Sequence, residues 1–233
     1  MNMETRISFS VIMPTFNQSW FIRRAIDSLF KQTYTNWELI IVNDGSTDET
    51  ETFITDYMND RRVRYIRNAY NTGLGHALNQ GLDVARYDHI AYLPSDDFYF
   101  DNHLESLSRA FSGNDELFLV YSGVRYESRD SLFYSPDVES KGLRRGNCLQ
   151  LVQTAHRWLT RDEYVTEDLY QMFWGRVSGE GAFGRTDEIT CFWTQHPHQR
   201  HKITGERYGG GLNKYRLYYK VKNPIRMKVS KQK

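Results

Sequence analysis

Two adjacent carboxylates, Asp96 and Asp97, lie in the stretch AYLPSDDFY at residues 91–99, directly after an apolar run that predicts a buried strand. Two like charges side by side repel each other and are costly to desolvate, so a loop that holds them is either solvated or neutralised by a cation. Carboxylate oxygens are the ligands that hard divalent cations prefer. The pair is therefore a candidate metal site, and a solvated cap for the following helix is the ordinary alternative.

Three further polar motifs also follow apolar runs in this chain. The four motifs are PTFN at 14–17, NDGSTD at 43–48, NTGLGHALNQG at 71–81 and PSDD at 94–97. Each alone has an ordinary explanation as turn or loop chemistry. Four of them at the ends of consecutive predicted strands favour one shared binding site over four unrelated turns.

The elements that would position these motifs are short apolar runs alternating with amphipathic segments. Strands are predicted to begin at Phe9, Trp37, Val63, His89 and Leu117. Helices are predicted over 21–30, after the capping-box signature STDE at 46–49, and over 74–85. This order predicts an α/β fold, a Rossmann-like and mostly parallel sheet with helices on both faces, in which ligands bind at the carboxyl ends of the strands.

The pattern becomes less regular after about residue 124. A tyrosine-rich hairpin is predicted up to residue 134, then helices over 143–158 and 167–176, then short strands near Ala182 and Thr190. Three glycines at 209–211 interrupt the chain and pack no side chains. We therefore expect one domain over 1–208, divided into halves 1–112 and 113–208, followed by a basic tail over 209–233.

The net charge of +1 conceals an uneven distribution of charge along the chain. Residues 212–233 carry eight Lys and Arg residues and no acidic residue, which leaves about −7 on the rest. Basic residues interleaved with Tyr, Leu and Ile suit the headgroup region of an anionic membrane, and a solubilising tail is the alternative. No apolar stretch is long enough to span a bilayer, and the N-terminus lacks signal-peptide features. We expect a cytoplasmic protein, with the tail as a peripheral contact to the inner face of the membrane.

Several classes of protein are disfavoured by what the motifs lack. Neither GxGxxG after the first strand nor GxxxxGK[ST] occurs, which argues against a dinucleotide-binding domain and a P-loop enzyme. Nucleotidyltransferases usually carry a Gly-rich loop with Arg and Lys after the first strand, and PTFNQSW has neither. Cys148 and Cys191 have no metal or redox spacing, so we expect two reduced thiols. No nucleic-acid partner is expected.

The stretch VIMPTFNQSWFIRRAIDSLFKQTYTNWELIIVNDGSTDET, followed in order by NTGLGHALNQGL and YLPSDD, resembles the family 2 glycosyltransferases of the GT-A fold. The resemblance covers residues 8–112 and weakens over 113–205, where such enzymes bind diverse acceptors. It implies transfer of a sugar from a nucleotide-diphosphate donor, most commonly a UDP-sugar, with inversion and with Mn²⁺ or Mg²⁺. The implied acceptor is a glycan or a lipid-linked glycan used in cell-surface synthesis.

The resemblance also implies roles for single residues. The implied nucleotide-sugar-binding residues are Pro14, Thr15, Phe16, Asn17, Asp44, Asn71, Gly75, Asn79 and Asp96. Asp44 would accept a hydrogen bond from the base. Asp97 is the preferred metal ligand, with Asp96 beside it. Many relatives have Asp where this chain has Pro94, which leaves two carboxylates in the motif.

The motif VTED at 165–168 precedes an amphipathic run. Thr166 as a helix cap is the ordinary interpretation. The resemblance instead implies that Asp168 is the general base that deprotonates the acceptor, with Glu167 supporting it.

A histidine-rich segment lies near residue 200. His196 and His198 are candidate further metal ligands, with ordinary surface histidines as the alternative. The segment lacks the QxxRW element of processive synthases, so addition of single sugars is favoured. The alternative function is a catalytically silent nucleotide-sugar-binding protein.

Overall fold

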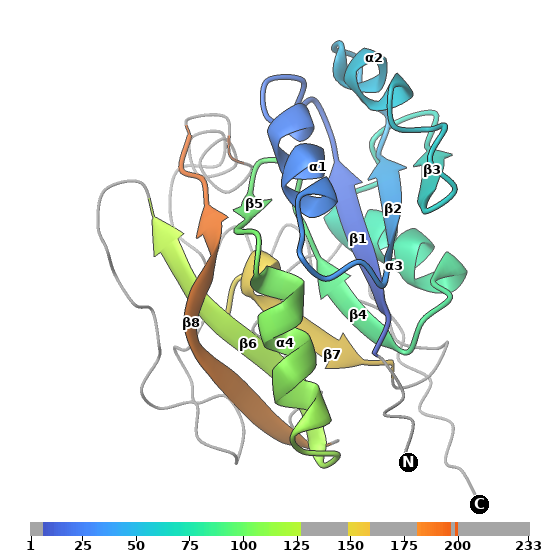
Figure 1. The fold of residues 1–233 in the computed structure, drawn as a ribbon. Coiled ribbons are helices and arrows are strands. Elements are labelled where there is room, and N and C mark those ends of the chain that lie inside the picture. The colour runs from blue at the N-terminus through green and yellow to red at the C-terminus, as the bar shows by residue number, and fades with distance from the viewer. Residues whose placement is uncertain (1–6, 127–148, 159–180, 197–198, 200–233) are drawn as a thin grey trace, which may run out of the picture.

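The structure is a computed structural model that describes residues 7–126, 149–158, 181–196 and 199. Its centre is an eight-stranded sheet with the strand order β3-β2-β1-β4-β7-β6-β8-β5 (Figure 1). The strands are β1 (Phe9–Thr15), β2 (Trp37–Asn43), β3 (Val63–Arg67), β4 (His89–Tyr92), β5 (Phe98–Tyr99), β6 (Leu117–Tyr126), β7 (Thr154–Arg157) and β8 (Ala182–Trp193). The helices are α1 (Ile22–Phe30), α2 (Thr50–Thr55), α3 (Leu74–Val84) and α4 (His103–Ser112), with a 3₁₀ turn η1 (Leu151–Gln153).

The predicted strands at Phe9, Trp37, Val63, His89 and Leu117 all form. β1 to β4 pair in parallel, whereas β7 runs antiparallel to both β4 and β6. β8 is parallel to β6 and antiparallel to the edge strand β5. The parallel half carries the four motifs, and the mixed half returns the chain to the same sheet.

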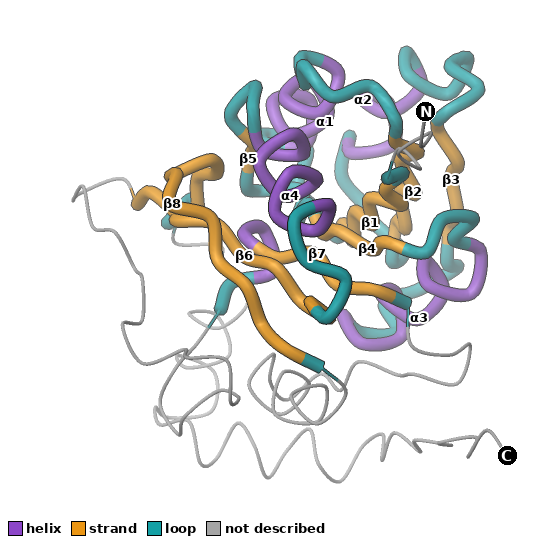
Figure 2. The backbone as a smooth tube through the Cα atoms, turned by 60° about the horizontal axis from the view of Figure 1, so that its bottom comes forward, coloured by secondary structure: helices purple, strands orange, loops and turns teal. Residues whose placement is uncertain are grey.

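Helices cover both faces of the sheet, as predicted (Figure 2). Val11 and Met13 of β1 pack in the core cluster that includes α1 and α4. Ile12, between them, points to the opposite face and packs in the cluster with Leu78 of α3. The period of two along a strand therefore divides the apolar run of β1 between two helix layers.

The prediction of a helix over 143–158 is wrong over the residues that the structure describes there. Residues 151–157 form η1 and β7, while 143–148 lie outside the described residues. β7 fills the place between β4 and β6, and Ala155 pairs with Ala91 on one side and Val120 on the other. These pairings come from distant parts of the chain, and they override a local pattern that a helix could also satisfy. The two short strands expected near Ala182 and Thr190 form as the single strand β8.

The capping box predicted at 46–49 is also wrong. α2 begins at Thr50, and its N-cap residue, Glu49, makes no side-chain capping bond. Ser46 bonds to another loop instead, as described below, and Asp48 bonds both to that loop and to the amide of Thr50 at the start of α2.

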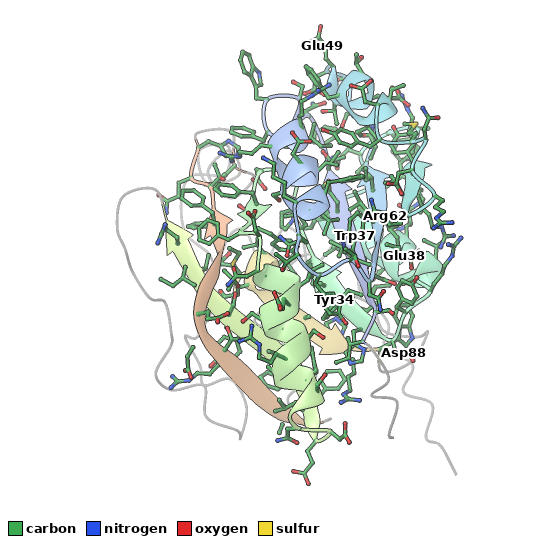
Figure 3. All side chains as sticks on the ribbon, viewed as in Figure 1. Tyr34, Trp37, Glu38, Glu49, Arg62 and Asp88 are labelled. Atoms are coloured by element: carbon green, nitrogen blue, oxygen red, sulfur yellow. The ribbon has the colours of Figure 1, made fainter. Side chains whose placement is uncertain are left out.

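The two edges of the parallel half differ in chemistry. Figure 3 shows Glu49 by the carboxyl ends of the strands and Asp88 at the opposite edge. Near that opposite edge, the buried Glu38 accepts hydrogen bonds from the Ser10 hydroxyl and the Arg86 amide, each at 2.7 Å. This network ties β2 to β1 and to the loop before β4, so the amino edge is closed by internal bonds.

In the described ranges, no helix combines the length and the apolar character needed to cross a bilayer. Cys191 is a buried, free thiol, and Cys148 lies outside the described residues.

Replacing Gly81 by Ala tests how closely α3 packs on the sheet. A Cβ at Gly81 would lie 2.5 Å from Cγ2 of the buried Ile12, which cannot move away easily because a β-branched side chain is stiff. The gain in helix propensity offsets part of this clash, and we expect a net loss of about 1–2 kcal/mol in the free energy of unfolding. Urea titration measures it.

Gly113→Ala is the matched control. Gly113 has a φ of −80°, and a Cβ there meets nothing nearer than 3.5 Å. Its free energy of unfolding should stay within about 1 kcal/mol of the wild type. An equal free energy of unfolding for the two variants would show that α3 does not pack tightly against Ile12 at Gly81.

Candidate active site at the carboxyl edge of the sheet

Asp44, one residue past the end of β2, binds the loop that follows β3. Its Oδ1 accepts hydrogen bonds from Asn68 Nδ2 (2.8 Å), the Thr72 amide (2.9 Å) and the Thr72 hydroxyl (2.6 Å). Its Oδ2 accepts one from the Gly73 amide at 2.7 Å. The residue is 3% exposed, so these donors replace the water that a carboxylate loses on burial. Asp44 therefore holds loop 68–73 in place.

Gly45 lets that loop come close. Its φ is +76°, and a Cβ at this position would lie 2.5 Å from the carbonyl carbon of Tyr70. Only glycine allows both this backbone conformation and this approach. The Asp-Gly pair in the NDGSTD motif thus serves one purpose, the seating of loop 68–73 against the end of β2.

The rest of the motif binds the loop after β1. The Ser46 hydroxyl accepts a hydrogen bond from the Asn17 amide at 2.9 Å, and Asp48 Oδ2 accepts one from the Ser19 amide at 3.0 Å. The Oδ1 of Asn17, a residue with a φ of 53°, accepts a hydrogen bond from the Thr47 amide at 2.8 Å. Burial raises the pKa of Asp48, but its hydrogen bonds with Thr50 and Ser19 outweigh this effect and hold the pKa below its usual value. The side chain of Asn17, predicted to bind nucleotide, is bonded to this loop.

Loop 68–73 leads directly into α3, so the N-terminus of this helix lies at the same edge of the sheet. Gly73, with a φ of 103°, is its N-cap, and the amide of Gly73 is bonded to Asp44. Gly75 in the first turn is buried, Asn79 one turn later is 9% exposed, and Asn71 is exposed. A helix N-terminus presents free amide hydrogens and a partial positive charge, which suits an anionic group.

Thr15 ends β1, Phe16 follows it, and the Thr15 backbone is bonded to Asp44. The Thr15 carbonyl accepts a hydrogen bond from the Asp44 amide at 2.8 Å. The Thr15 hydroxyl is buried and has no hydrogen-bond partner among the described residues. Phe16 is 40% exposed, although the loop around it is held on both sides. A buried hydroxyl that lacks a partner among the described residues, followed in the chain by an exposed aromatic ring, is compatible with a ligand site.

The two carboxylates of the PSDD motif have different surroundings. Asp97 is 3% exposed, and its Oδ1 accepts a hydrogen bond from the Thr194 amide at 2.9 Å. Burial, and then the charge of Asp96, raises the pKa of Asp97 well above its usual range. Asp96 is less buried, and its Oδ2 lies 3.2 Å from His196 Nε2. The structure thus brings Asp96 to a predicted histidine, and binds Asp97 to the backbone.

The pairing of β5 with β8 produces this arrangement. Phe98 pairs with Phe192 and Tyr99 with Cys191 in an antiparallel ladder. Continuing that register towards the motif sets Asp96 opposite Thr194, two residues before His196. Gln199 also contacts this segment, because its Nε2 donates a hydrogen bond to the Thr194 carbonyl at 2.5 Å.

The Asp96 and His196 pair suits a cation that takes most of its ligands from a substrate. The described residues contain no group of three or more His, Cys, Asp or Glu side chains that could hold a metal ion. Mg²⁺ is commonly bound by one or two carboxylates together with substrate phosphates and water, and imidazole is a common ligand of transition metals. A carboxylate and an imidazole that face each other fit this type of site, with the remaining ligands supplied by a diphosphate.

Several predicted residues fall outside the described part of the chain. These are Glu167, Asp168, His198 and the tail over 209–233. Other residues of the site were not predicted: Asn68 and Thr72, which bind Asp44, and Arg24 and Thr194, which contact the PSDD motif. Turn residues such as Asn and Thr gave a weak local signal, whereas nothing in the neighbourhood of Arg24 or Thr194 indicates their partners.

Comparison with known families identifies the chain. The model of the glycosyl transferase family 2 matches residues 10–169. The chain belongs to this family. The match includes the four motifs and the edge of the sheet at which they meet.

Curated relatives carry glycosyltransferase names. An uncharacterized glycosyltransferase of Haemophilus influenzae is 26% identical over 94% of this chain and 76% of its own length. The Escherichia coli protein WfgD, named a UDP-Glc:alpha-D-GlcNAc-diphosphoundecaprenol beta-1,3-glucosyltransferase, is 40% identical over 41% of this chain and 38% of its own length. For many of the relatives, the match spans only about two fifths of the relative's length.

Solved structures show the same fold, the GT-A fold. The structure of Staphylococcus aureus TarS 1–349 in complex with UDP-GlcNAc superposes with a TM-score of 0.70, at 19% identity, over 85% of this chain and 61% of that one. The Pyrobaculum calidifontis mannosyltransferase PcManGT, in complex with GDP-Man and Mn²⁺, gives 0.64 at 17% identity, over 88% and 62%.

Asp44→Asn tests the role of the carboxylate in holding loop 68–73. The substitution turns one acceptor oxygen into an amide that faces a donor, so we expect a loss of about 1–3 kcal/mol in the free energy of unfolding. Amide hydrogen exchange over residues 68–74 should become faster as well. Asp115→Asn is the control, because the Asp115 side chain is fully exposed and its Oδ1 lies 3.7 Å from Arg157; it should stay within about 0.5 kcal/mol of the wild type. Unchanged exchange in Asp44→Asn would contradict this role.

Proposed function

We propose that the chain transfers a sugar from a UDP-sugar to an acceptor hydroxyl, by a metal-assisted displacement with inversion. The observation that carries the proposal is the pairing of Asp96 with His196 at 3.2 Å, at the same edge of the sheet as the buried hydroxyl of Thr15, which has no partner in the described part of the chain. One part of this edge suits a cation and a diphosphate, and the other suits a nucleoside.

The nucleoside side of the proposed site is supported by groups from the loop after β1 and from the start of α3. Thr15 offers its hydroxyl and Phe16 its exposed ring, on a loop held by Ser46 and Asp48. Asn71, Gly75 and Asn79 border the N-terminus of α3, where the ribose and the diphosphate would lie. The TarS structure contains UDP-GlcNAc, which is the reason for choosing a uridine donor.

We assign direct contact with the cation to Asp96 and His196. Asp97 is the metal ligand preferred from the sequence. Here it would support the site without touching the cation, because its Oδ1 is bonded to the Thr194 amide and the residue is buried. A Mn²⁺ or Mg²⁺ ion bound there would neutralise charge on the leaving diphosphate. The Mn²⁺ and GDP-Man in the PcManGT structure support a divalent cation in this fold.

The acceptor side of the proposal depends on residues outside the described ranges. Asp168 would serve as the general base, with Glu167 beside it, because an inverting displacement needs a carboxylate on the face opposite the leaving group. The name of WfgD gives a sugar linked to diphosphoundecaprenol as its acceptor, which supports a glycan or lipid-linked acceptor for this chain. The tail over 209–233 would bring the protein to an anionic membrane surface from the cytoplasm.

A panel of nucleotide sugars tests the reaction. With Mn²⁺ present, we expect slow release of UDP from at least one UDP-sugar, measured by a coupled assay for nucleotide diphosphate. Asp168→Asn should lower release by roughly 10²-fold while binding UDP normally, because only the proton acceptor is lost. Release of nucleotide diphosphate from GDP-sugars alone would show that the donor carries guanine and not uracil. Binding without any release would favour the alternative of a silent nucleotide-sugar-binding protein.

Because the two carboxylates have different surroundings, we expect their replacement to change the response to Mn²⁺ differently. Asp96→Asn should make UDP affinity insensitive to Mn²⁺, because the carboxylate that faces His196 is lost. Asp97→Asn keeps an oxygen for the Thr194 amide, so it should keep most of the Mn²⁺ response. Calorimetric titration of UDP in Mn²⁺ and in EDTA measures both. If Asp97→Asn loses the response and Asp96→Asn keeps it, the two assignments must be exchanged.

A further inference from the structure

Arg24, in the first turn of α1, joins the two segments that carry Asp96 and His196. Its Nη2 donates one hydrogen bond to the Asp96 carbonyl at 3.0 Å and another to the Thr194 hydroxyl at 2.7 Å. These acceptors are 72 and 170 residues away in the chain. One guanidinium nitrogen thus bridges the loop after β4 and the end of β8.

Aromatic rings fix the orientation of this guanidinium. Its carbon lies 4.7 Å from the centre of the Phe98 ring and 5.8 Å from that of Phe21. Phe98 stacks on Phe192 of β8, with 4.7 Å between centroids and 13° between planes. Phe21 packs on the imidazole of His196 at 4.5 Å. The rings that orient Arg24 therefore also contact the strand and the histidine of the site.

The bridge completes a set of contacts around the Asp96 and His196 pair. Thr194 donates its amide to Asp97 and its hydroxyl accepts from Arg24, so both the backbone and the side chain of this residue are bound. The Asp96 backbone is held through its carbonyl, which leaves the carboxylate to face His196. The separation of the carboxylate from the imidazole is thus set by bonds on either side of it.

We propose that Arg24 is a positioning residue for the reaction, holding the loop of Asp96 against the segment of His196 so that the two side chains meet a divalent cation and the donor diphosphate in fixed geometry. This inference rests on the proposed function. An arginine suits the position because its planar group stacks on rings while it donates, which a lysine does less well. Partners that orient metal ligands typically change metal affinity by roughly 10- to 100-fold when they are replaced.

The test uses Arg24→Gln and Arg24→Lys, with Arg23→Gln as the matched control. Arg23 is the preceding residue of the same helix, and its ion pair at 2.7 Å is with the exposed Asp56 of another segment, not with the PSDD motif. Three quantities are measured on the full chain: the melting temperature, amide hydrogen exchange over 94–98 and 191–196, and the affinity of Mn²⁺ in the presence of UDP.

Arg24→Gln should melt close to the wild type, exchange faster over both segments, and bind Mn²⁺ with UDP roughly 10-fold more weakly or worse. Arg24→Lys should recover part of the Mn²⁺ affinity, because an ammonium can still donate, and Arg23→Gln should match the wild type in all three measurements. The partial rescue separates a positioning role from a general loss of stability.

Wild-type exchange and Mn²⁺ affinity in Arg24→Gln would overturn the inference while leaving the proposed function intact. A fall in melting temperature with unchanged Mn²⁺ affinity would overturn it too, and would assign Arg24 to stability. If the wild-type protein binds no UDP with Mn²⁺, the proposed function is overturned and the positioning role falls with it. The exchange measurement, which needs no ligand, then still shows whether Arg24 joins the two segments.

Discussion

The buried carboxylate of Asp44 is the interaction on which the carboxyl edge of the sheet depends. A carboxylate without water is costly, and here the Asn68 amide, the Thr72 amide and hydroxyl, and the Gly73 amide compensate for the loss. Those donors belong to one loop, so satisfying the charge also fixes the loop. Because Gly73 is the N-cap of α3, the start of that helix is fixed as well. The electrostatic need of one side chain thus determines where the positive end of a helix lies.

The carboxylates of this edge divide into satisfied and available groups. Asp44 is saturated by its loop, and Asp97 is buried against the Thr194 amide. The Oδ2 of Asp96, which is less buried, lies 3.2 Å from the imidazole Nε2 of His196. A carboxylate whose acceptor positions are all used within the protein holds the backbone in place. A carboxylate with acceptor positions left can bind a ligand. The two adjacent carboxylates thus have different surroundings, because Asp97 is bonded to the backbone of Thr194 and Asp96 faces the imidazole of His196.

The sequence predicts what is local and misses what is paired over long distances. The strands of the parallel half and α3 were predicted, because apolar runs and helical periodicity lie within a few residues. β7 was mistaken for part of a helix, since its pairing with β4 and β6 comes from segments far away in the chain. The same reason explains the false capping box: Ser46 bonds to Asn17, 29 residues away, in place of its own helix. At the carboxyl edge, the motifs contain Asp44, Asp96 and His196, but they do not indicate which carboxylate of the pair faces the histidine.

The mixed half of the sheet explains why His196 lies close to the PSDD motif, although the two are about 100 residues apart in the chain. A purely parallel sheet would gather only the loops that follow its strands. Here β7 reverses direction between β4 and β6, and the long strand β8 then runs parallel to β6 and antiparallel to β5. β5 follows the PSDD motif directly, so its two-residue ladder with β8 sets the register between that motif and the end of β8. So short a ladder is weak by itself, and the contacts beside it, from Arg24, Asp97 and the stacked Phe98 and Phe192, are what hold this register.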